Sequence, residues 1–189
     1  MMSIDLTITR GSTFAQAIPC RTGERAYRTV KRIENSAPCR LEVPAHGLTD
    51  FWPVRFERVR GIPQLNRYAG GVRVTDENNI VLPDFNAVGL REYGGVGVLV
   101  YDVPLDLSGY TARMHVRDPV TGDLLLELTT ENGRIRLGEP VGFALLEVSA
   151  TETEEIAWTN GRYDIELVSG SYVTKLAGGT VTILDEETR

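Results

Sequence analysis

The stretch VPLDLSGYTARMHVRD, residues Val103–Asp118, decides the fold class of this chain, because it contains a turn followed directly by a segment with the regular alternation of a strand. Pro104 and Gly109 mark the turn, since both residue types interrupt regular structure. From residue 111 to residue 117, polar side chains alternate with apolar ones. Alternation with a period of two is typical of a strand with one buried and one solvated face. The stretch therefore predicts a sheet with a packed side and a wet side.

Segments of the same kind lie on both sides of this stretch. Towards the N-terminus, Ile4–Thr9 and Thr13–Cys20 are predicted strands with a Gly-Ser turn between them. Towards the C-terminus, the predicted strands are 123–130, 134–137, 143–148, 163–167, 172–176 and 180–184. Ser149 followed by Glu152 has the form of a capping box, which predicts a short helical turn. The chain is thus expected to be all-β.

The connection between Cys20 and Pro104 is too long for a loop. It exceeds 80 residues, and a structureless loop of that length is improbable inside a compact domain. Short strands are predicted within it at 37–43 and 54–59, with a hairpin of 72–74 and 80–82 around Asp76–Asn79. Short strands at this spacing are typical of a small β-barrel or sandwich.

We therefore predict a host domain of residues 1–28 and 102–189 that carries an inserted small β domain of residues 29–101. Loop-closure scaling gives a cost of roughly 2.4 kcal/mol for an insertion of this length. A folded insert costs less if its two ends lie close together. The prediction therefore requires the strands near Cys20 and Pro104 to adjoin.

Three segments in order resemble the N-terminal domain of phage upper-baseplate (BppU-type) proteins. The first contains Ile8, Arg10, Gly11, Thr13 and Phe14, the second is Pro104–Ala112 with its motif residues Pro104, Asp106, Leu107 and Gly109, and the third is Ser149–Leu167. The resemblance implies an Ig-like β-sandwich for the host domain. The position and size of the insert depart from the pattern of that family.

The insert resembles a second module. The pattern of His46-Gly47-Leu48 followed by Gly61, Leu65 and Asn66, with Tyr93–Gly97 as closing strand, is similar to the first catalytic cysteine half-domain of ubiquitin-activating enzymes, which recurs in phage virion proteins. The name of that module does not imply catalysis here. Cys39 stands on an ordinary alternating strand, without a neighbouring His or base that would lower its pKa.

The sequence offers little for catalysis or metal binding. Its two cysteines, Cys20 and Cys39, are expected to be reduced and either buried or half-buried. His46 is expected in a structural turn and His115 on a solvated strand face. Neither pair has the spacing of metal ligands, and the glycines at 94, 95 and 97 do not open a helix as a phosphate loop does. We expect no enzyme activity, no catalytic residue, no metal and no cofactor.

Composition and charge exclude further classes of function. The formal net charge is -6, whereas nucleic-acid modules normally carry a basic face. Residues 29–101 hold nine Lys/Arg and eight Asp/Glu, so the remainder carries a charge of -7. No run reaches the roughly 20 apolar residues of a membrane span, and the N-terminus lacks the form of a signal peptide. The chain is expected to be made in a bacterial cytoplasm, without nucleic-acid or membrane partners.

The function is therefore expected to depend on surfaces. The candidate interface residues are the cluster of Arg55, Arg58 and Arg60 and the acidic Glu152, Glu154 and Glu155. The resemblance implies a non-enzymatic bacteriophage virion protein that connects neighbouring virion proteins in the tail, baseplate or neck. Copies of the chain are expected to associate in a symmetric ring or multimer. A capsid decoration protein or head-fibre base is one alternative. A glycan- or receptor-binding module is another, with Phe51, Trp52 and Trp158 as its aromatic platform.

Overall fold

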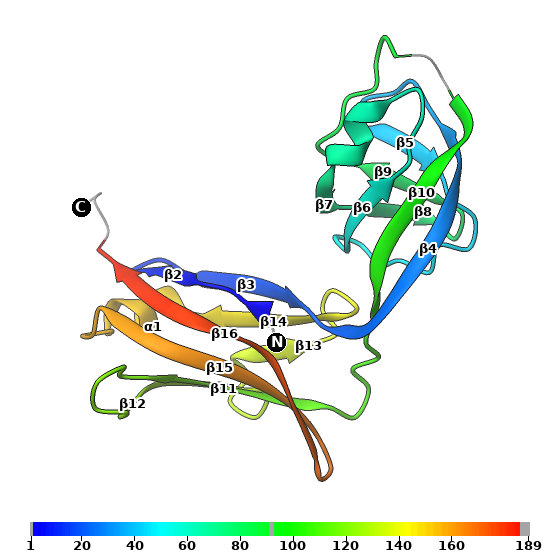
Figure 1. Ribbon diagram of the computed structural model, residues 1–189. Helices are drawn as coiled ribbons and strands as arrows, with labels where there is room; N and C mark the ends of the chain where they lie inside the picture. Colours follow the sequence, from blue (N-terminus) through cyan, green and yellow to red (C-terminus); the bar gives the residue numbers. More distant parts are fainter. Residues whose placement is uncertain (1, 91–92, 186–189) are drawn as a thin grey trace. The chain divides into compact units, whose positions relative to one another are not determined.

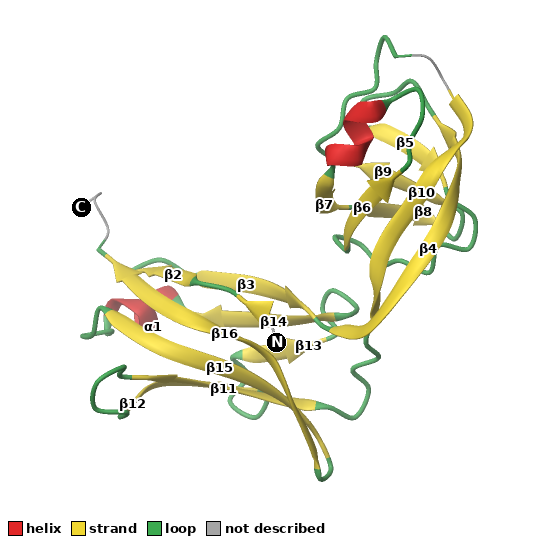
Figure 2. Cartoon of the chain, viewed as in Figure 1, coloured by secondary structure: helices red, strands yellow, loops and turns green. Residues whose placement is uncertain are grey.

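The computed structural model describes residues 2–90 and 93–185, and these residues form strands almost throughout (Figures 1 and 2). The all-β prediction is confirmed: a β-sandwich and a barrel-like domain share the chain. Contacts divide the chain into two compact units. The host unit comprises Met1–Cys20, Leu107–Glu139 and Phe143–Arg189, and the inserted unit comprises Arg21–Asp106 and Pro140–Gly142.

Two sheets make up the host unit. Its elements are β1 (Met2–Ser3), β2 (Leu6–Thr9), β3 (Phe14–Pro19), β11 (Thr111–Arg117), β12 (Leu124–Thr129), β13 (Ile135–Leu137), β14 (Phe143–Val148), α1 (Ala150–Glu154), β15 (Asn160–Ser169) and β16 (Tyr172–Leu184). The larger sheet has the order β1-β16-β15-β11-β12, and β2 also pairs with β16; the smaller sheet has the order β13-β14-β3. The first strand pairs parallel with the last one, so both ends of the described chain lie in the same sheet.

Alternation along the central strands explains the core between these sheets. In β11, Ala112, Met114 and Val116 are buried, and the residues between them are exposed or half-buried. The buried face of β15 continues this layer with Tyr163 and Ile165. Each fully buried large aliphatic side chain stabilises the fold by about 1.5–3 kcal/mol relative to exposure.

The inserted unit is a single sheet that closes on itself almost completely. Its elements are β4 (Arg21–Ile33), β5 (Cys39–Glu42), β6 (Pro53–Glu57), the 3₁₀ helix η1 (Pro63–Arg67), β7 (Ala69–Gly71), β8 (Arg73–Asp76), β9 (Asn79–Leu82) and β10 (Tyr93–Pro104). The sheet order is β7-β6-β10-β4-β5-β9-β8. Only Val72 separates β7 from β8, so the two ends of the sheet lie on one continuous segment. A barrel closed in this way leaves few unpaired strand edges.

The inserted unit begins and ends in one antiparallel ladder. The strands β4 and β10 run side by side from the pair Ile33 and Tyr93 to the pair Arg21 and Pro104 (Figure 1). The residues that follow Cys20 and lie at Pro104 are therefore adjacent, as the prediction of an insertion requires. The ladder has irregular register between Gly94 and Gly97 and again between Asp102 and Pro104.

The boundaries of the inserted unit are wider than the predicted 29–101. Residues 21–28 were expected in the host, but they form the first part of β4. This strand was missed because only Ala26, Val30 and Ile33 of its 13 residues are buried, and its charged outer face hides the alternation. Residues 102–106 also belong to the inserted unit, because β10 extends to Pro104, and so do Pro140–Gly142, which were expected in the host.

The predicted strand Ile4–Thr9 is interrupted in the structure. β1 and β2 are separated at Ile4 and Asp5, where the Ile4 N–H still donates to the Gly178 carbonyl at 3.1 Å and side chains supply further hydrogen bonds. Tyr163 Oη donates to the Ile4 carbonyl at 2.6 Å, and the Asp5 carboxylate accepts from the Thr180 backbone N–H at 3.0 Å. Both contacts come from residues more than 150 positions away, which local alternation cannot indicate.

Candidate interaction surface

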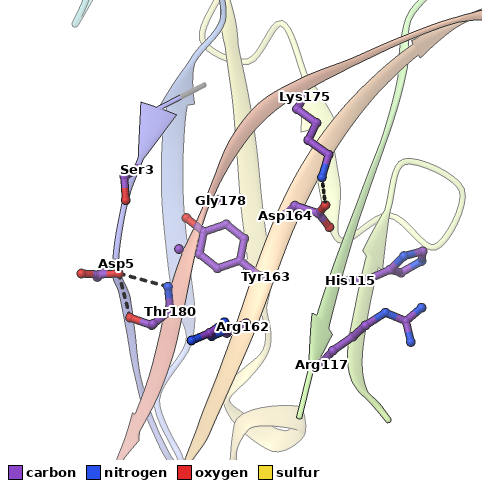
Figure 3. A pocket seen from close by; sticks show the side chains of 11 residues that line it. Ser3, Asp5, His115, Arg117, Arg162, Tyr163, Asp164, Lys175, Gly178 and Thr180 are labelled. Carbon is purple, nitrogen blue, oxygen red and sulfur yellow. Dashed lines mark hydrogen bonds and ion pairs between the residues drawn. The ribbon is translucent and has the colours of Figure 1, made fainter. Parts of the chain in front are cut away.

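The solvated face of the larger host sheet carries a shallow recess of about 560 Å³ (Figure 3). It lies over β11, β15 and β16, and the charged and polar side chains around it include Asp5, Arg117, Arg162, Asp164, Lys175 and Thr180. The sequence predicted the wet face of β11, but not which residues of β15 and β16 complete it. Register sets that arrangement, and a single strand does not reveal its register.

Most charges on this face are neutralised by a neighbour across the sheet. Arg113 contacts Glu166 at 2.7 Å, and Lys175 contacts Asp164 at 2.6 Å. The Asp164 carboxylate raises the pKa of Lys175 through this hydrogen bond. His115 lies 3.1 Å from Glu127. These pairs are exposed, so each contributes little to stability, but together they set the charge pattern of this face.

The edges of the host sheets differ in how they are protected. On β12, the Glu127 carbonyl accepts from Asn132 Nδ2 at 3.2 Å and from Arg134 Nη1 at 2.9 Å, and the Thr129 backbone N–H donates to Asn132 Oδ1 at 2.9 Å. Side chains therefore occupy backbone groups that another strand would need. The edge strand β13 has only three residues, and the β1–β2 edge is interrupted as described above.

The edge formed by β3 is open at Ala15 and Ala17, whereas Pro19, the next outward position, has no N–H. On β14, Phe143 and Glu147 bond to the β13 side, so the residues between them face β3 and pair with its even-numbered positions. Ala15 and Ala17 therefore point their backbone groups outward. The Ala17 carbonyl accepts only the exposed Gln16 side chain, at 3.1 Å, among the contacts in the described ranges. An extended strand can pair with such an edge through main-chain hydrogen bonds.

The predicted arginine cluster is not a continuous strand rim. Strand β6 ends at Glu57, so Arg55 lies on the strand and contacts Glu57 at 3.4 Å. Arg58 follows it with a positive φ of 57°, which turns the chain away from the strand. Arg60 is exposed beyond this turn. No contact in the described ranges joins the three guanidinium groups to a common partner.

The predicted acidic segment divides into one structural residue and two exposed ones. The capping box is confirmed: Ser149 Oγ accepts from the Glu152 N–H, and the Glu152 carboxylate accepts from the Ser149 N–H at 2.9 Å. Glu152 also pairs with Arg134 at 2.5 Å. These hydrogen bonds from Ser149 and Arg134 lower the pKa of Glu152 to about 2. Glu154 and Glu155 are exposed.

A Glu152→Ala substitution should lower the free energy of unfolding by about 1 kcal/mol at pH 7, because it removes half of the capping box. The pKa of Glu152 is depressed in the folded state, so its contribution is present above the ordinary value near 4.5 and is lost as the pH falls towards 2. The difference between wild type and variant should therefore shrink from pH 5 to pH 2.5. Urea denaturation across this range measures it. Glu155→Ala is the control, and an equal loss in both variants would contradict the assignment.

His46 is a structural residue of the barrel. Its side chain is 1% exposed, its Nε2 lies 2.8 Å from the Asp76 carbonyl, and its Nδ1 accepts from the Leu48 backbone N–H at 3.0 Å. These contacts assign the Nε2–H tautomer. Tyr101 Oη donates to the His46 carbonyl. Since both ring nitrogens are bound to backbone groups, the ring has no nitrogen left for a substrate.

The two cysteines are buried thiols. Burial raises the pKa of Cys20 to about 12, and burial followed by the charge of Glu34 raises the pKa of Cys39 to about 11. A thiol with so high a pKa is almost entirely protonated at neutral pH, whereas the thiolate is the nucleophile. Cys39 Sγ also lies 3.7 Å from the Glu34 carbonyl and donates towards it.

The aromatic platform suggested by the sequence does not form as expected. Trp52 is fully buried, and its Nε1 donates to the Asp102 carbonyl at 2.8 Å. Phe51 is exposed, but it belongs to the inserted unit, and the half-buried Trp158 belongs to the host unit. Trp52 therefore has no ring face to offer to a sugar.

The residues of the two sequence motifs have structural roles. Leu48 and Leu65 are buried in the barrel, and the Asn66 side chain bonds both the N–H and the carbonyl of Val59, at 2.9 and 3.0 Å. Leu107 is buried in the host. The remaining motif residues lie at turns or strand ends, with positive φ at the glycines: Gly47, Gly61, Pro104, Asp106 and Gly109.

Within residues 2–90 and 93–185, no group of three or more metal-binding side chains gathers in one place. The same residues contain no helix of the length and hydropathy that a membrane span requires. No protein-family model matches the chain, and no curated protein sequence matches it.

Proposed function

We propose that this protein is a non-enzymatic structural component of a bacteriophage virion that connects neighbouring virion proteins in the tail, baseplate or neck. The observation that carries the proposal is the open edge of β3 in a unit whose other described edges are capped, short or interrupted. Natural proteins protect sheet edges against unwanted pairing. An edge left open is therefore a site for a strand of a neighbour, from another virion protein or from a second copy.

Two further features support an assembly role. The side chains that the sequence offered for chemistry, His46 and Cys39, are fixed in the barrel by structural hydrogen bonds and burial. Residues 21–106 begin in β4 and end in β10, which pair with each other, so an insertion of this kind can serve as a spacer or a contact module. The resemblance of both units to modules of phage virion proteins supports a virion as the assembly that the protein joins.

Labelling of intact phage particles tests the proposal. An antibody raised against the purified chain is applied to particles from the bacterial strain that encodes it, and the label is located by electron microscopy. We expect labelling at one site along the tail, baseplate or neck, and the chain in the mass spectrum of purified particles. Labelling over the whole capsid would favour the decoration alternative. Absence of the chain from the particles would overturn the proposal.

The role of the β3 edge has its own prediction. Ala17→Pro removes an outward N–H, whereas Gln16→Pro removes an inward N–H that bonds to Leu146. Because proline is tolerated only where strand N–H groups are unpaired, Gln16→Pro should lower the free energy of unfolding by about 2 kcal/mol more than Ala17→Pro. Ala17→Pro should fold and yet fail to enter particles in a complementation assay. Equal destabilisation, or normal incorporation of Ala17→Pro, would contradict this role of the edge.

A further inference from the structure

Two arginines stand directly opposite each other on the solvated face of the host sheet. Arg117 of β11 and Arg162 of β15 are partners in register, and Thr180 of β16 is the next residue in the same row. All three line the recess, and all three are exposed (Figure 3). Like charges directly across a strand pair are destabilising. This row therefore differs from its neighbours, in which opposite charges meet.

Neither arginine of the row pairs with a carboxylate in the part of the chain that the structure describes. Arg117 donates one hydrogen bond, to the Gly122 carbonyl at 3.1 Å. Arg162 makes no side-chain hydrogen bond or ion pair within residues 2–90 and 93–185. The acidic group at the end of the row, Asp5, accepts from the Thr180 N–H at 3.0 Å and from Thr180 Oγ1 at 2.7 Å. Those hydrogen bonds lower the pKa of Asp5, and they hold its Oδ1 on Thr180.

Charge around the recess contrasts with the charge of the unit that carries it. Three cationic side chains line the recess, Arg117, Arg162 and Lys175, against two carboxylates, Asp5 and Asp164. One cation, Lys175, is already neutralised by Asp164 at 2.6 Å. The host unit as a whole has eight Lys/Arg and fifteen Asp/Glu, a net charge of -7. The recess therefore carries a local excess of positive charge although the host unit as a whole is acidic. An anionic group would be attracted to this part of the surface.

The surroundings of the two arginines favour a polypeptide over a small anion. Leu124 lies opposite Arg117 on β12 and is 50% exposed, and Val120, in the turn between the strands, is 91% exposed. Exposed apolar side chains beside paired guanidinium groups fit a segment that carries both acidic and apolar residues. A guanidinium group binds a carboxylate through two parallel hydrogen bonds. Facing side chains on neighbouring strands have Cβ atoms about 5 Å apart, close enough for both guanidinium groups to reach one carboxylate.

We propose that the row of Arg117, Arg162 and Thr180 binds a carboxylate side chain in an acidic segment of a partner protein. The two guanidinium groups donate to the carboxylate oxygens, and Leu124 and Val120 contact the apolar residues next to it. This contact is additional to the proposed function, and it does not depend on which assembly the protein joins. The β3 edge lies in the other sheet, so this proposal and the role of that edge can fail separately.

The experiment titrates the ¹⁵N-labelled full chain with hexaglutamate at low salt and follows amide and arginine side-chain shifts by NMR. Hexaglutamine and inorganic phosphate are parallel probes. Arg162→Gln and Arg117→Gln should each weaken hexaglutamate binding by about fivefold, as expected for an exposed charge pair. Arg113→Gln is the matched control. It removes the same charge from the same face, but Arg113 already has Glu166 as a partner. The affinity of this variant for hexaglutamate should therefore differ from that of the wild type by less than twofold. Melting temperatures confirm that each variant is folded.

The supporting result is a set of chemical-shift changes centred on Arg117 and Arg162 when hexaglutamate is added, and no such changes when hexaglutamine is added. An equal loss of affinity in all three variants would mean general attraction by charge and would overturn the site. Tighter binding of phosphate than of hexaglutamate would overturn the assignment to an acidic polypeptide. Absence of shifts at millimolar hexaglutamate would overturn the proposal altogether, and particle labelling would be unaffected by any of these results.

Discussion

Replacement of His46 by alanine should lower the free energy of unfolding by about 4 kcal/mol, because it removes a buried ring and leaves two backbone groups without partners. Those groups are the Leu48 N–H and the Asp76 carbonyl, which the ring joins across the turn after β5 and the β8–β9 hairpin. An unsatisfied buried group costs about 1–3 kcal/mol. The substitution would destabilise the inserted unit. Urea denaturation followed by tryptophan fluorescence reports it, since Trp52 lies in that unit.

His46→Asn provides a graded test. An asparagine oxygen can accept from the N–H two residues on, so it can replace Nδ1 towards Leu48 but cannot reach Asp76. The loss should be about half of that for alanine. His115→Ala on the exposed host face is the control and should change stability by less than about 0.5 kcal/mol. If His46→Ala unfolds at the same urea concentration as wild type, the ring does not hold the barrel together.

The second large effect is expected at Trp52, where alanine should cost about 4 kcal/mol. The side chain is fully buried and donates to the Asp102 carbonyl, and its backbone carbonyl accepts from the Val72 N–H at 3.2 Å. Val72 is the residue between β7 and β8, so Trp52 packs where the barrel closes. Calorimetry measures the change as a lower melting temperature.

Phe51→Ala is the matched control for Trp52→Ala. Phe51 is 58% exposed, so alanine should change stability by less than about 1 kcal/mol. The pair also bears on the receptor-binding alternative, because a glycan platform would depend on these two rings. A stable Trp52→Ala variant, or glycan binding that Phe51→Ala abolishes, would contradict the structural role given to this segment.

Local alternation predicted the host better than the insert. The buried positions of β11 and the bounds of β14 follow from period-two patterns with one wet face, and the capping box at Ser149 follows from two residue types at fixed spacing. The strand β4 could not be found in this way, because only three of its 13 residues are buried and its partner β10 lies about 70 positions away. The 3₁₀ helix η1 was not predicted either, because five residues are too few for a helical period to show in the sequence.

The candidate surfaces were the least predictable part. Arg113, His115 and Arg117 share the wet face of one strand, but their different surroundings depend on the residues opposite them on β15 and β12. The capping of the β12 edge by Asn132 and Arg134 likewise depends on the path of a loop. The burial of Trp52 was missed because a tryptophan next to a turn is compatible with both an exposed and a buried position.

We expect the host sandwich to fold without the barrel it carries, because Arg21 and Pro104 are cross-strand partners. Replacing residues 22–103 by Asn-Gly would join these partners by a two-residue hairpin turn. Circular dichroism and thermal unfolding of this shortened chain test the claim. We expect a soluble β-protein that unfolds in one cooperative transition. A shortened chain that is unfolded or aggregated under conditions in which the full chain is folded would contradict it.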